Sequence, residues 1–273
     1  MTILVTGATG TVGRRVAGEL IQAGHRVRAL TRDPSRANLP AGVEVVAGDL
    51  TVTDSLVPVF DGVTAAHLIT FGGKDFGALR NGQEIVDLAV KAGVRRVTVL
   101  GGWDEGTLEP AVRAGALDWT FVQPTEFMSN ALHWAEGVRA EGVVREPFGD
   151  ATTAMVHEAD IAAVAATALV RDGHAGRTYG LTGPERLTTR DKVRIIGEAI
   201  GREVRFVELT EAQARARMAA QGMPPELIDF LIGVFGDVPV EPNTVNSTIE
   251  EVTGRPARSF AQWAAENAAA FRA

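Results

Sequence analysis

A glycine-rich turn directly behind a short apolar run constrains this chain more than any other feature of its sequence. The run Ile3–Thr6 is followed by Gly-Ala-Thr-Gly-Thr-Val-Gly at positions 7–13, and a helix is predicted from Val12 to Ala23. In such a turn the first glycine permits the tight bend, the second lets backbone N–H groups approach a pyrophosphate, and the third lets the helix pack closely on the strand. A second strand over 26–31 completes a βαβ unit. The turn therefore predicts a dinucleotide site that includes Gly7, Thr9, Gly10, Thr11, Val12 and Gly13.

The alternation of strands and helices continues along the first half of the chain. Strands are predicted over 43–47, 65–70, 94–100 and 119–122, with helices over 54–60, 78–92 and 109–114. Strands that are apolar almost throughout and alternate with helices are typical of a parallel sheet covered on both faces. We expect an α/β, Rossmann-type doubly wound sheet whose ligand lies beyond the carboxyl ends of the strands.

The regular alternation stops at Pro124, and mostly helical segments follow. Helices are predicted over 126–136, 159–170 and 260–271, and a strand over 176–181 is expected to rejoin the sheet. We therefore expect a dinucleotide-binding domain over 1–150. A smaller, mostly helical lobe over 151–273 is expected to cover the substrate side, with the chain re-entering the sheet near 176–182.

Composition excludes several classes of function. With no cysteine among 273 residues, the chain has no disulfide, thiol nucleophile or cysteine-ligated metal. A net charge of −7 argues against nucleic-acid binding, and no apolar run reaches the roughly 20 residues of a membrane helix. No spacing of His, Asp and Glu indicates a metal site. Because the first residues already belong to the first strand, no signal peptide is expected, and the sequence predicts a cytoplasmic protein.

The end of the second predicted strand indicates which dinucleotide binds. An NAD site commonly has Asp or Glu there for the ribose hydroxyls, whereas an NADP site has cations for the 2′-phosphate. Here Arg32 stands at that position and Arg36 follows one helical turn later, and a guanidinium binds phosphate through two hydrogen bonds. The alternative is a solvated Arg32 with Asp33 on the ribose, although Asp33 is also a candidate N-cap for the helix after Pro34. The pattern favours NADP(H).

Seven segments spread over nearly the whole chain carry a family resemblance. They begin at Thr6, Thr31, Gly48, Ala92, Val122, Tyr179 and Val252 and read TGATGTVG, TRDP, GDL, AGVRRV, VQPTEFMSN, YGLTGPE and VTGRP. In this order they resemble an atypical short-chain dehydrogenase/reductase of the NmrA-like group, which includes NADPH quinone and azo reductases. The resemblance implies that Asp49 and Leu50 lie near the adenine, that Leu68, Ile69, Thr70 and Gly101 line the cofactor, and that Pro124 through Phe127 lie by the nicotinamide.

The catalytic group of the wider superfamily is missing from this sequence. Most relatives there use a serine and a Tyr-x-x-x-Lys pair, in which the lysine lowers the pKa of the tyrosine. Here Tyr179 is the only tyrosine, Gly183 stands at the lysine position, and the end of the fifth strand reads Gly101-Gly102-Trp103 in place of serine. Tyr179 is interpreted as a strand residue, so no catalytic residue follows from the motif.

The missing acid favours acceptors that need little help with protonation. A simple ketone gives an alkoxide whose conjugate acid has a pKa of about 15.7, whereas a quinone gives a phenolate-type oxyanion whose conjugate acid has a pKa of about 10. The difference of roughly 6 units is worth about 8 kcal/mol. Direct hydride transfer to a quinone or another conjugated or aromatic carbonyl is therefore the leading prediction.

Three titratable side chains are weighed as candidates for proton transfer. His133 is a candidate proton relay, with a surface or helix-packing histidine as the alternative. Glu126 is a candidate acid if desolvation raises its pKa, although acids in a first helical turn also complement the helix dipole. His67, inside the fourth strand, is interpreted as a buried and hydrogen-bonded imidazole rather than a catalytic one.

Two aromatic side chains and one amide are expected at the substrate. Trp103 and Phe127 are candidates for stacking on a flat acceptor, with core packing as the alternative, and Asn130 is the third candidate for contact with the substrate.

Two other functions fit the same residues. A non-catalytic, NADP(H)-binding redox sensor or regulator would suit the absent triad, because the NmrA-like group includes such members. The other is a tailoring ketoreductase for an aromatic polyketide. The high alanine content and the excess of arginine over lysine are typical of a high-GC genome, which agrees with such a biosynthetic role.

Overall fold

The computed structural model describes residues 1–73, 77–101, 105–236 and 244–272, and the chain divides into two compact units. Unit 1 comprises Met1–Pro124, Glu158–Leu181 and Thr248–Arg255, and unit 2 comprises Thr125–His157, Thr182–Ser247 and Pro256–Ala273. The boundary expected at residue 150 falls inside a segment of unit 2, because the chain leaves the sheet at Pro124 and returns to it with the helix and strand over 158–181.

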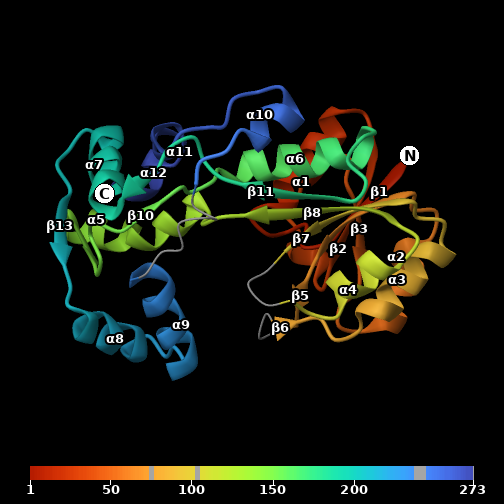
Figure 1. Ribbon diagram of the computed structural model, residues 1–273, viewed down its shortest axis with the longest axis horizontal. Coiled ribbons are helices and arrows are strands. Elements are labelled where there is room, and N and C mark those ends of the chain that lie inside the picture. Colours follow the sequence, from red (N-terminus) through yellow and green to blue (C-terminus); the bar gives the residue numbers. More distant parts are fainter. Residues whose placement is uncertain (74–76, 102–104, 237–243, 273) are drawn as a thin grey trace. The chain divides into compact units, whose positions relative to one another are not determined.

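Unit 1 is built on one sheet of seven strands (Figure 1). In spatial order these are β11 (Arg177–Leu181), β8 (Asp118–Pro124), β7 (Arg96–Leu100), β4 (Ala65–Ile69), β1 (Thr2–Val5), β2 (Arg26–Thr31) and β3 (Glu44–Ala47). Every pairing in this sheet is parallel, and Leu4 of β1 lies beside Arg28 on β2 and Ala66 on β4. The strand order reverses between β1 and β4, which is where open α/β sheets bind their ligands.

Helices cover both faces of this sheet (Figure 1). One face carries α1 (Gly13–Gln22), α6 (Glu158–Val170) and α10 (Thr248–Thr253), and the other carries α2 (Val57–Phe60), α3 (Gly82–Lys91) and α4 (Leu108–Ala114). Helix α6 is buried on almost every side because it contacts the sheet, α1 and α10. The predicted doubly wound, Rossmann-type class is confirmed.

Two short strands before α3 change one predicted boundary. β5 (Phe71–Gly72) and β6 (Gly77–Ala78) pair antiparallel, so the helix expected from residue 78 begins only at Gly82.

Unit 2 is mostly helical, as predicted for the C-terminal lobe. Its helices are the 3₁₀ segment η3 (Met128–Trp134), α5 (Ala135–Glu141), α7 (Thr189–Ile200), α8 (Glu211–Ala220), α9 (Pro225–Gly236), α11 (Phe260–Glu266) and α12 (Ala268–Phe271). Two small strand pairs accompany them, β9 (Val143–Glu146) with β13 (Arg205–Glu208) and β10 (Thr152–Thr153) with β12 (Leu187–Thr188). Phe260 stacks on Trp263 with ring centroids 5.3 Å apart, which anchors the tail in the core of the unit.

Two predicted helices of unit 2 differ from those observed. The helix expected over 126–136 is wrong: Phe127 is held extended by a bridge to Val156, a 3₁₀ segment follows, and the α-helix starts at Ala135. The final helix expected over 260–271 is interrupted at Asn267, whose side-chain amide donates to the Trp263 carbonyl at 2.8 Å.

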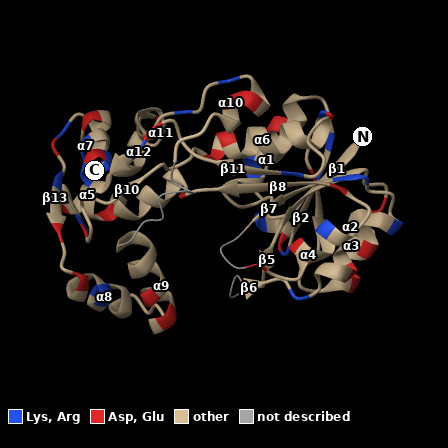
Figure 2. Cartoon of the chain, viewed as in Figure 1, with Lys and Arg blue, Asp and Glu red and all other residues tan. Residues whose placement is uncertain are grey.

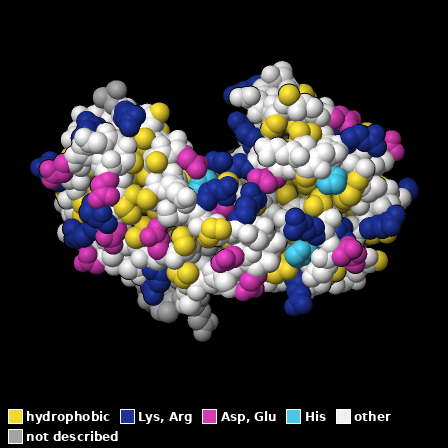
Figure 3. Space-filling model, turned by 90° about the horizontal axis from the view of Figure 1, so that it is seen from above, with side chains coloured by type: hydrophobic (Ala, Val, Ile, Leu, Met, Phe, Trp, Pro, Cys, Tyr) yellow, Lys and Arg dark blue, Asp and Glu magenta, His cyan; other side chains and the backbone are white. Residues whose placement is uncertain are grey.

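Charged side chains of both signs are interspersed over the surface. Acidic and basic residues are spread over the elements of both units (Figure 2), and the face drawn in Figure 3 carries both signs side by side. Within the described ranges, no helix combines the length and apolar character that spanning a membrane requires. The same residues contain no group of three or more His, Asp or Glu side chains placed to hold a metal ion.

His67 lies fully buried in the middle of the sheet. Its Nδ1 atom is 2.9 Å from Oγ1 of Thr98 on the neighbouring strand, while Nε2 has no hydrogen-bond partner among the described residues. The imidazole is therefore buried, as expected, but only half satisfied. Burial lowers the pKa of His67 from 6.5 to about 4, because a charged ring has no compensating partner there.

We predict that His67 makes the fold sensitive to mild acid. The unfolded chain takes up a proton at pH 6.5, whereas the folded chain resists it down to about pH 4. Stability is therefore fully present above pH 6.5 and falls below it by about 1.4 kcal/mol per pH unit, up to about 3 kcal/mol. Urea unfolding of the wild type and His67→Gln between pH 7.5 and 4.5 measures the difference. Parallel curves for the two proteins would contradict the assignment.

Candidate functional site

The glycine turn behind β1 is closed by backbone contacts that leave no room for side chains. Gly7 has a left-handed φ of 59°, which glycine adopts without strain. The Gly10 N–H donates to the Gly7 carbonyl at 2.9 Å. A Cβ on Gly13 would lie 2.3 Å from the Gly7 oxygen, so α1 can start this close to the turn only with glycine at that position.

Helix α1 begins without a side-chain cap. Its N-cap residue is Val12, whose side chain has no atom that can accept a hydrogen bond from the helix N–H groups. The first turn carries Arg14 and Arg15 but no acid. A helix N-terminus has partial positive charge and unpaired N–H groups, and it favours an anion. With the glycine turn in front of it, this terminus fits a phosphate group.

The end of β2 separates the roles of two neighbouring charges. The Asp33 carboxylate accepts from the N–H of Ser35 at 3.0 Å and caps the short 3₁₀ turn Pro34–Arg36, so the predicted N-cap role is confirmed. The hydrogen bond from the Ser35 side chain, aided by Arg36, lowers the pKa of Asp33. Arg32 is exposed, and one guanidinium nitrogen donates to the Gly73 carbonyl at 2.7 Å. Asp33 is thus committed to the turn, while Arg32 is exposed and, among the described residues, has the Gly73 carbonyl as its one recorded hydrogen-bond partner.

Most of the other residues expected at the cofactor lie at or just after the carboxyl ends of strands in unit 1, whereas Phe127 lies in unit 2. Leu68 and Ile69 end β4 and Thr70 follows it, Gly101 follows β7, Asp49 and Leu50 follow β3, and Pro124 ends β8. Thr6 ties the turn to β4, because its hydroxyl donates to the His67 carbonyl and accepts from the Ile69 N–H, both at 3.0 Å. The Asp49 carboxylate accepts from the Thr51 N–H at 2.9 Å, which fixes the loop after β3.

Unit 2 contains a cavity of about 300 Å³ whose walls differ in polarity. One wall is apolar and includes Phe148, Leu209, Met218, Met223, Ile232 and Phe235. The polar part of the lining comprises Glu126, His133, Glu146, Thr153, Lys192 and Arg217. A cavity with an apolar body and a few polar groups is typical of a small-molecule site.

A buried lysine forms part of the polar lining. The Nζ atom of Lys192 donates to Oγ1 of Thr153 at 2.6 Å, and the Thr153 hydroxyl donates to Oε2 of Glu126 at 2.8 Å. Burial lowers the pKa of Lys192, and the Glu126 carboxylate opposes that shift. Sequence reasoning named Glu126 but missed Lys192 and Thr153. The available signal was the position of Lys192 on α7, three and four residues before the buried Ile195 and Ile196.

His133 lies at the open side of the same lining. Its Nε2 atom is 2.8 Å from Oε1 of Glu146, and the side chain is about half exposed, at 53%. Burial opposes a charge on the ring, but the Glu146 carboxylate and the Asn130 carbonyl outweigh it, so the pKa of His133 is raised. The histidine is therefore tied to Glu146 and stays a candidate proton relay.

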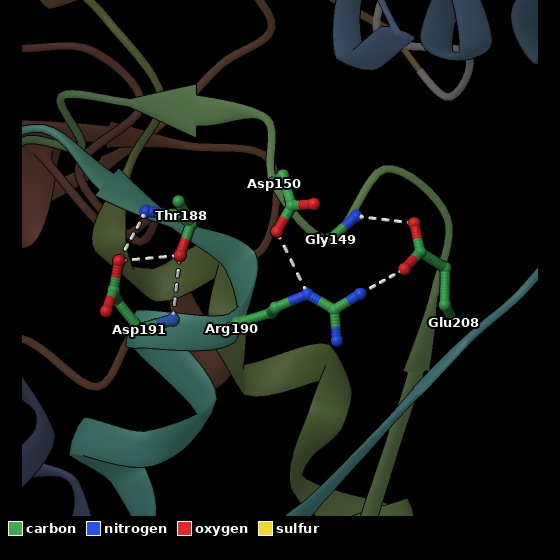
Figure 4. A network of polar contacts seen from close by, with 6 residues as sticks. All are labelled: Gly149, Asp150, Thr188, Arg190, Asp191 and Glu208. Atoms are coloured by element: carbon green, nitrogen blue, oxygen red, sulfur yellow. Dashed lines mark hydrogen bonds and ion pairs between the residues drawn. The ribbon is translucent and has the colours of Figure 1, made fainter.

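A polar network fixes the first turn of α7, from which Lys192 projects (Figure 4). The Thr188 hydroxyl accepts from the Asp191 N–H at 3.0 Å, and the Asp191 carboxylate accepts from the Thr188 N–H, which makes a capping box. Arg190 binds Asp150 at 3.0 Å and also pairs with Glu208 of β13. These contacts hold the start of α7 against the loop before β10.

The residues expected at the substrate are only partly placed. Trp103 lies outside the described residues. Phe127 is half-buried and Asn130 is exposed, and neither belongs to the lining of the cavity in unit 2. Tyr179 lies on β11 of unit 1, where its hydroxyl is 2.8 Å from Nδ1 of His174.

Comparisons with known proteins give the family. The family model described as "NmrA-like family" matches residues 1–99. A (4-alkanoyl-5-oxo-2,5-dihydrofuran-3-yl)methyl phosphate reductase of Streptomyces griseus is 40% identical over 98% of this chain and 99% of that protein. An NAD(P)H azoreductase of Xenophilus azovorans is 35% identical over 99% of each chain.

A solved structure shows the same fold over the full length. The NADPH-dependent quinone oxidoreductase of Escherichia coli, crystallised with NADPH, superimposes with a TM-score of 0.80 at 23% identity over 97% of this chain and 99% of that one. The fold and the two close relatives define an NAD(P)-type oxidoreductase of the atypical short-chain class. This chain belongs to the NmrA-like family and is a reductase of that family.

We predict that a side chain at position 13 lowers the free energy of unfolding, because Gly13 packs against the backbone of Gly7. Gly13→Ala places a methyl group within 2.3 Å of a backbone oxygen, so the turn must shift at a cost of about 1–3 kcal/mol. Gly18→Ala on the same helix meets only Pro40 at 3.9 Å and should stabilise by up to about 1 kcal/mol. Thermal unfolding of the two variants without nucleotide measures both. Equal melting temperatures would contradict the packing argument.

Proposed function

We propose that this protein is an NADPH-dependent reductase that transfers a hydride to a quinone or another conjugated or aromatic carbonyl. The observation that carries the proposal is the glycine turn closed against the uncapped start of α1, at the point where the strand order reverses. The turn residues and the α1 amides would hold the pyrophosphate. When bound, the nicotinamide supplies the hydride.

The choice of NADPH over NADH rests on Arg32. Asp33, the acid that follows Arg32 in the chain, already caps its own turn. Arg32 is exposed at the end of β2 with one hydrogen bond recorded among the described residues, and Arg36 follows on the same exposed turn. This arrangement supports a 2′-phosphate rather than a free ribose hydroxyl.

The acceptor class rests on the cavity of unit 2. Its apolar wall suits a flat or chain-bearing molecule, and its polar groups suit an oxygen at one end. The substrate named for the 40% identical relative is a methyl phosphate ester of a dihydrofuranone with an alkanoyl group, and its ring is a conjugated carbonyl system. The 35% identical relative is named for azo compounds, another conjugated class. Both names support an acceptor whose reduced form is a stabilised anion.

Turnover against a small acceptor panel tests the proposal. We expect NADPH oxidation, followed at 340 nm, with 2,3-dimethyl-1,4-naphthoquinone, a 3-acyl butenolide and an azo dye, and none with cyclohexanone. The ketone is disfavoured because its alkoxide needs about 8 kcal/mol more help with protonation than a phenolate-type anion. Tight NADPH binding without turnover on any acceptor would overturn the reductase proposal in favour of a redox sensor.

We predict that Arg32→Ala weakens NADPH binding by about tenfold or more, or about 1.4 kcal/mol, because a charge-assisted contact to the 2′-phosphate is lost. NADH binding should change little, since that cofactor lacks the phosphate. Fluorescence titration with each cofactor measures both values. Arg194→Ala on α7 is the control, because Arg194 is also an exposed arginine and pairs with Asp191 and Glu198. Equal losses for NADPH and NADH would remove Arg32 from the phosphate site.

A further inference from the structure

The cavity of unit 2 holds a charged side chain whose presence the apolar acceptor alone does not explain. Lys192 is only 4% exposed, yet it lines the cavity. Lysine is almost never buried without a partner, because removing an ammonium group from water is costly. A small-molecule site keeps such a group only where it meets a polar atom.

The contacts of Lys192 leave part of its donor capacity unused. Nζ donates one hydrogen bond, to Thr153, while Oε2 of Glu126 lies 3.6 Å away, beyond hydrogen-bond length. An ammonium group has three N–H donors. Among the described residues, Thr153 is the one hydrogen-bond acceptor recorded for Nζ. Two N–H groups are therefore available to a molecule in the cavity.

A purely structural role explains this geometry poorly. A buried ion pair adds little stability over apolar residues of similar volume unless the contact is direct and fully hydrogen-bonded. Here the attraction between ammonium and carboxylate passes through the Thr153 hydroxyl, and the group stands at a cavity wall rather than inside the packed core. The cluster orients Nζ without satisfying it.

We propose that Lys192 binds the oxygen of the acceptor in this cavity and gives the proton that the reduced acceptor takes up, with Thr153 and Glu126 as positioning residues. The inference rests on the proposed reductase function and supplies the acid that its missing Tyr-x-x-x-Lys pair leaves open. The substrate class is a conjugated carbonyl or quinone whose oxygen meets Nζ, with its apolar part against the wall that includes Met218 and Ile232.

The atoms and electrons of this step balance. When bound, NADPH would supply a hydride with its two electrons and would be left as NADP⁺. The acceptor oxygen gains negative charge, one N–H bond of the ammonium breaks, and an O–H bond forms. The neutral amine then recovers a proton from water. For a quinone the hydride and this one proton together give the hydroquinone, because hydroquinone differs from quinone by two electrons and two protons.

The charges around Lys192 determine how the step responds to pH. Burial lowers the pKa of its ammonium and Glu126 raises it. His133, Glu146 and Arg217 line the same cavity. On elements packed against α7, Glu266 pairs with His157 and Glu208 pairs with Arg190. The activity should hold at low pH and fall as pH rises through the lowered pKa of Lys192, because the neutral amine gives no proton.

The experiment compares Lys192→Met, Lys192→Arg and Glu126→Gln with Lys91→Met, which changes an exposed lysine on α3. With 2,3-dimethyl-1,4-naphthoquinone as acceptor, Lys192→Met should lower kcat/KM about 100-fold and abolish the alkaline fall, since a positioned acid contributes 10²–10⁴-fold. Lys192→Arg should keep KM near the wild-type value and lose kcat. Glu126→Gln should move the alkaline fall to lower pH, because it removes the charge that raises the pKa of Lys192.

Two measurements without turnover accompany the kinetics. NADPH affinity should stay unchanged in all four variants. Competitive acetylation of the three lysines, 74, 91 and 192, read by mass spectrometry across pH, should give Lys192 a lower pKa than Lys91, and the naphthoquinone should protect Lys192 alone. Two results would overturn the proton role. One is a Lys192→Met variant with the kcat/KM of the wild type, and the other is a Glu126→Gln variant whose activity falls at the same alkaline pH as that of the wild type.

A failure of the reductase proposal is distinguishable from a failure of this one. If the wild type turns over none of the acceptors, the reductase function falls, and protection of Lys192 by the naphthoquinone still decides whether its ammonium meets the ligand oxygen. Protection of Lys192 would support its binding to the ligand oxygen, without a role in proton transfer. Absence of protection would overturn it as well.

Discussion

The close approach of α1 to the turn at Gly7 is the contact on which the first unit depends. With no side chain at position 13, the helix starts within contact of a backbone oxygen and lies beside α6 over the parallel sheet. The same approach leaves the start of α1 uncapped where the strand order reverses. One packing constraint therefore determines both the position of the helix and the uncapped helix end to which we assign a phosphate group.

The cavity of the second unit combines apolar lining residues with polar ones that are fixed by hydrogen bonds and ion pairs. The capping box of α7 and the contacts of Arg190 with Asp150 and Glu208 fix the turn that carries Lys192. The lysine is then held by Thr153 rather than by direct contact with a carboxylate. A cavity of this kind can accept a conjugated molecule and still present an acidic hydrogen to its oxygen. Tyr179, the one tyrosine of the chain, lies on β11 of unit 1, where its hydroxyl contacts His174.

Local pattern was enough to predict the glycine turn, the class of the sheet, the cap at Asp33 and the strand that returns at 177–181. The cavity could not be predicted, because Thr153 meets Glu126 across 27 residues and Lys192 across 39. The bridge from Phe127 to Val156, which replaced an expected helix, is likewise a contact between distant segments. The spacing of Lys192 to the buried isoleucines of α7 indicates the buried face of that helix. The charge of a lysine, taken alone, indicates a solvated face instead.

The central claim is that the cofactor gives the hydride and the protein, through an exchangeable group, gives the proton. Turnover of a 3-acyl butenolide with NADPH deuterated at C4 tests it most directly, because the reduced carbon keeps the transferred atom. With one of the two C4 epimers, mass spectrometry should find one cofactor deuterium per product, and the second new hydrogen should come from solvent. A product that carries no cofactor deuterium with either epimer would contradict the account.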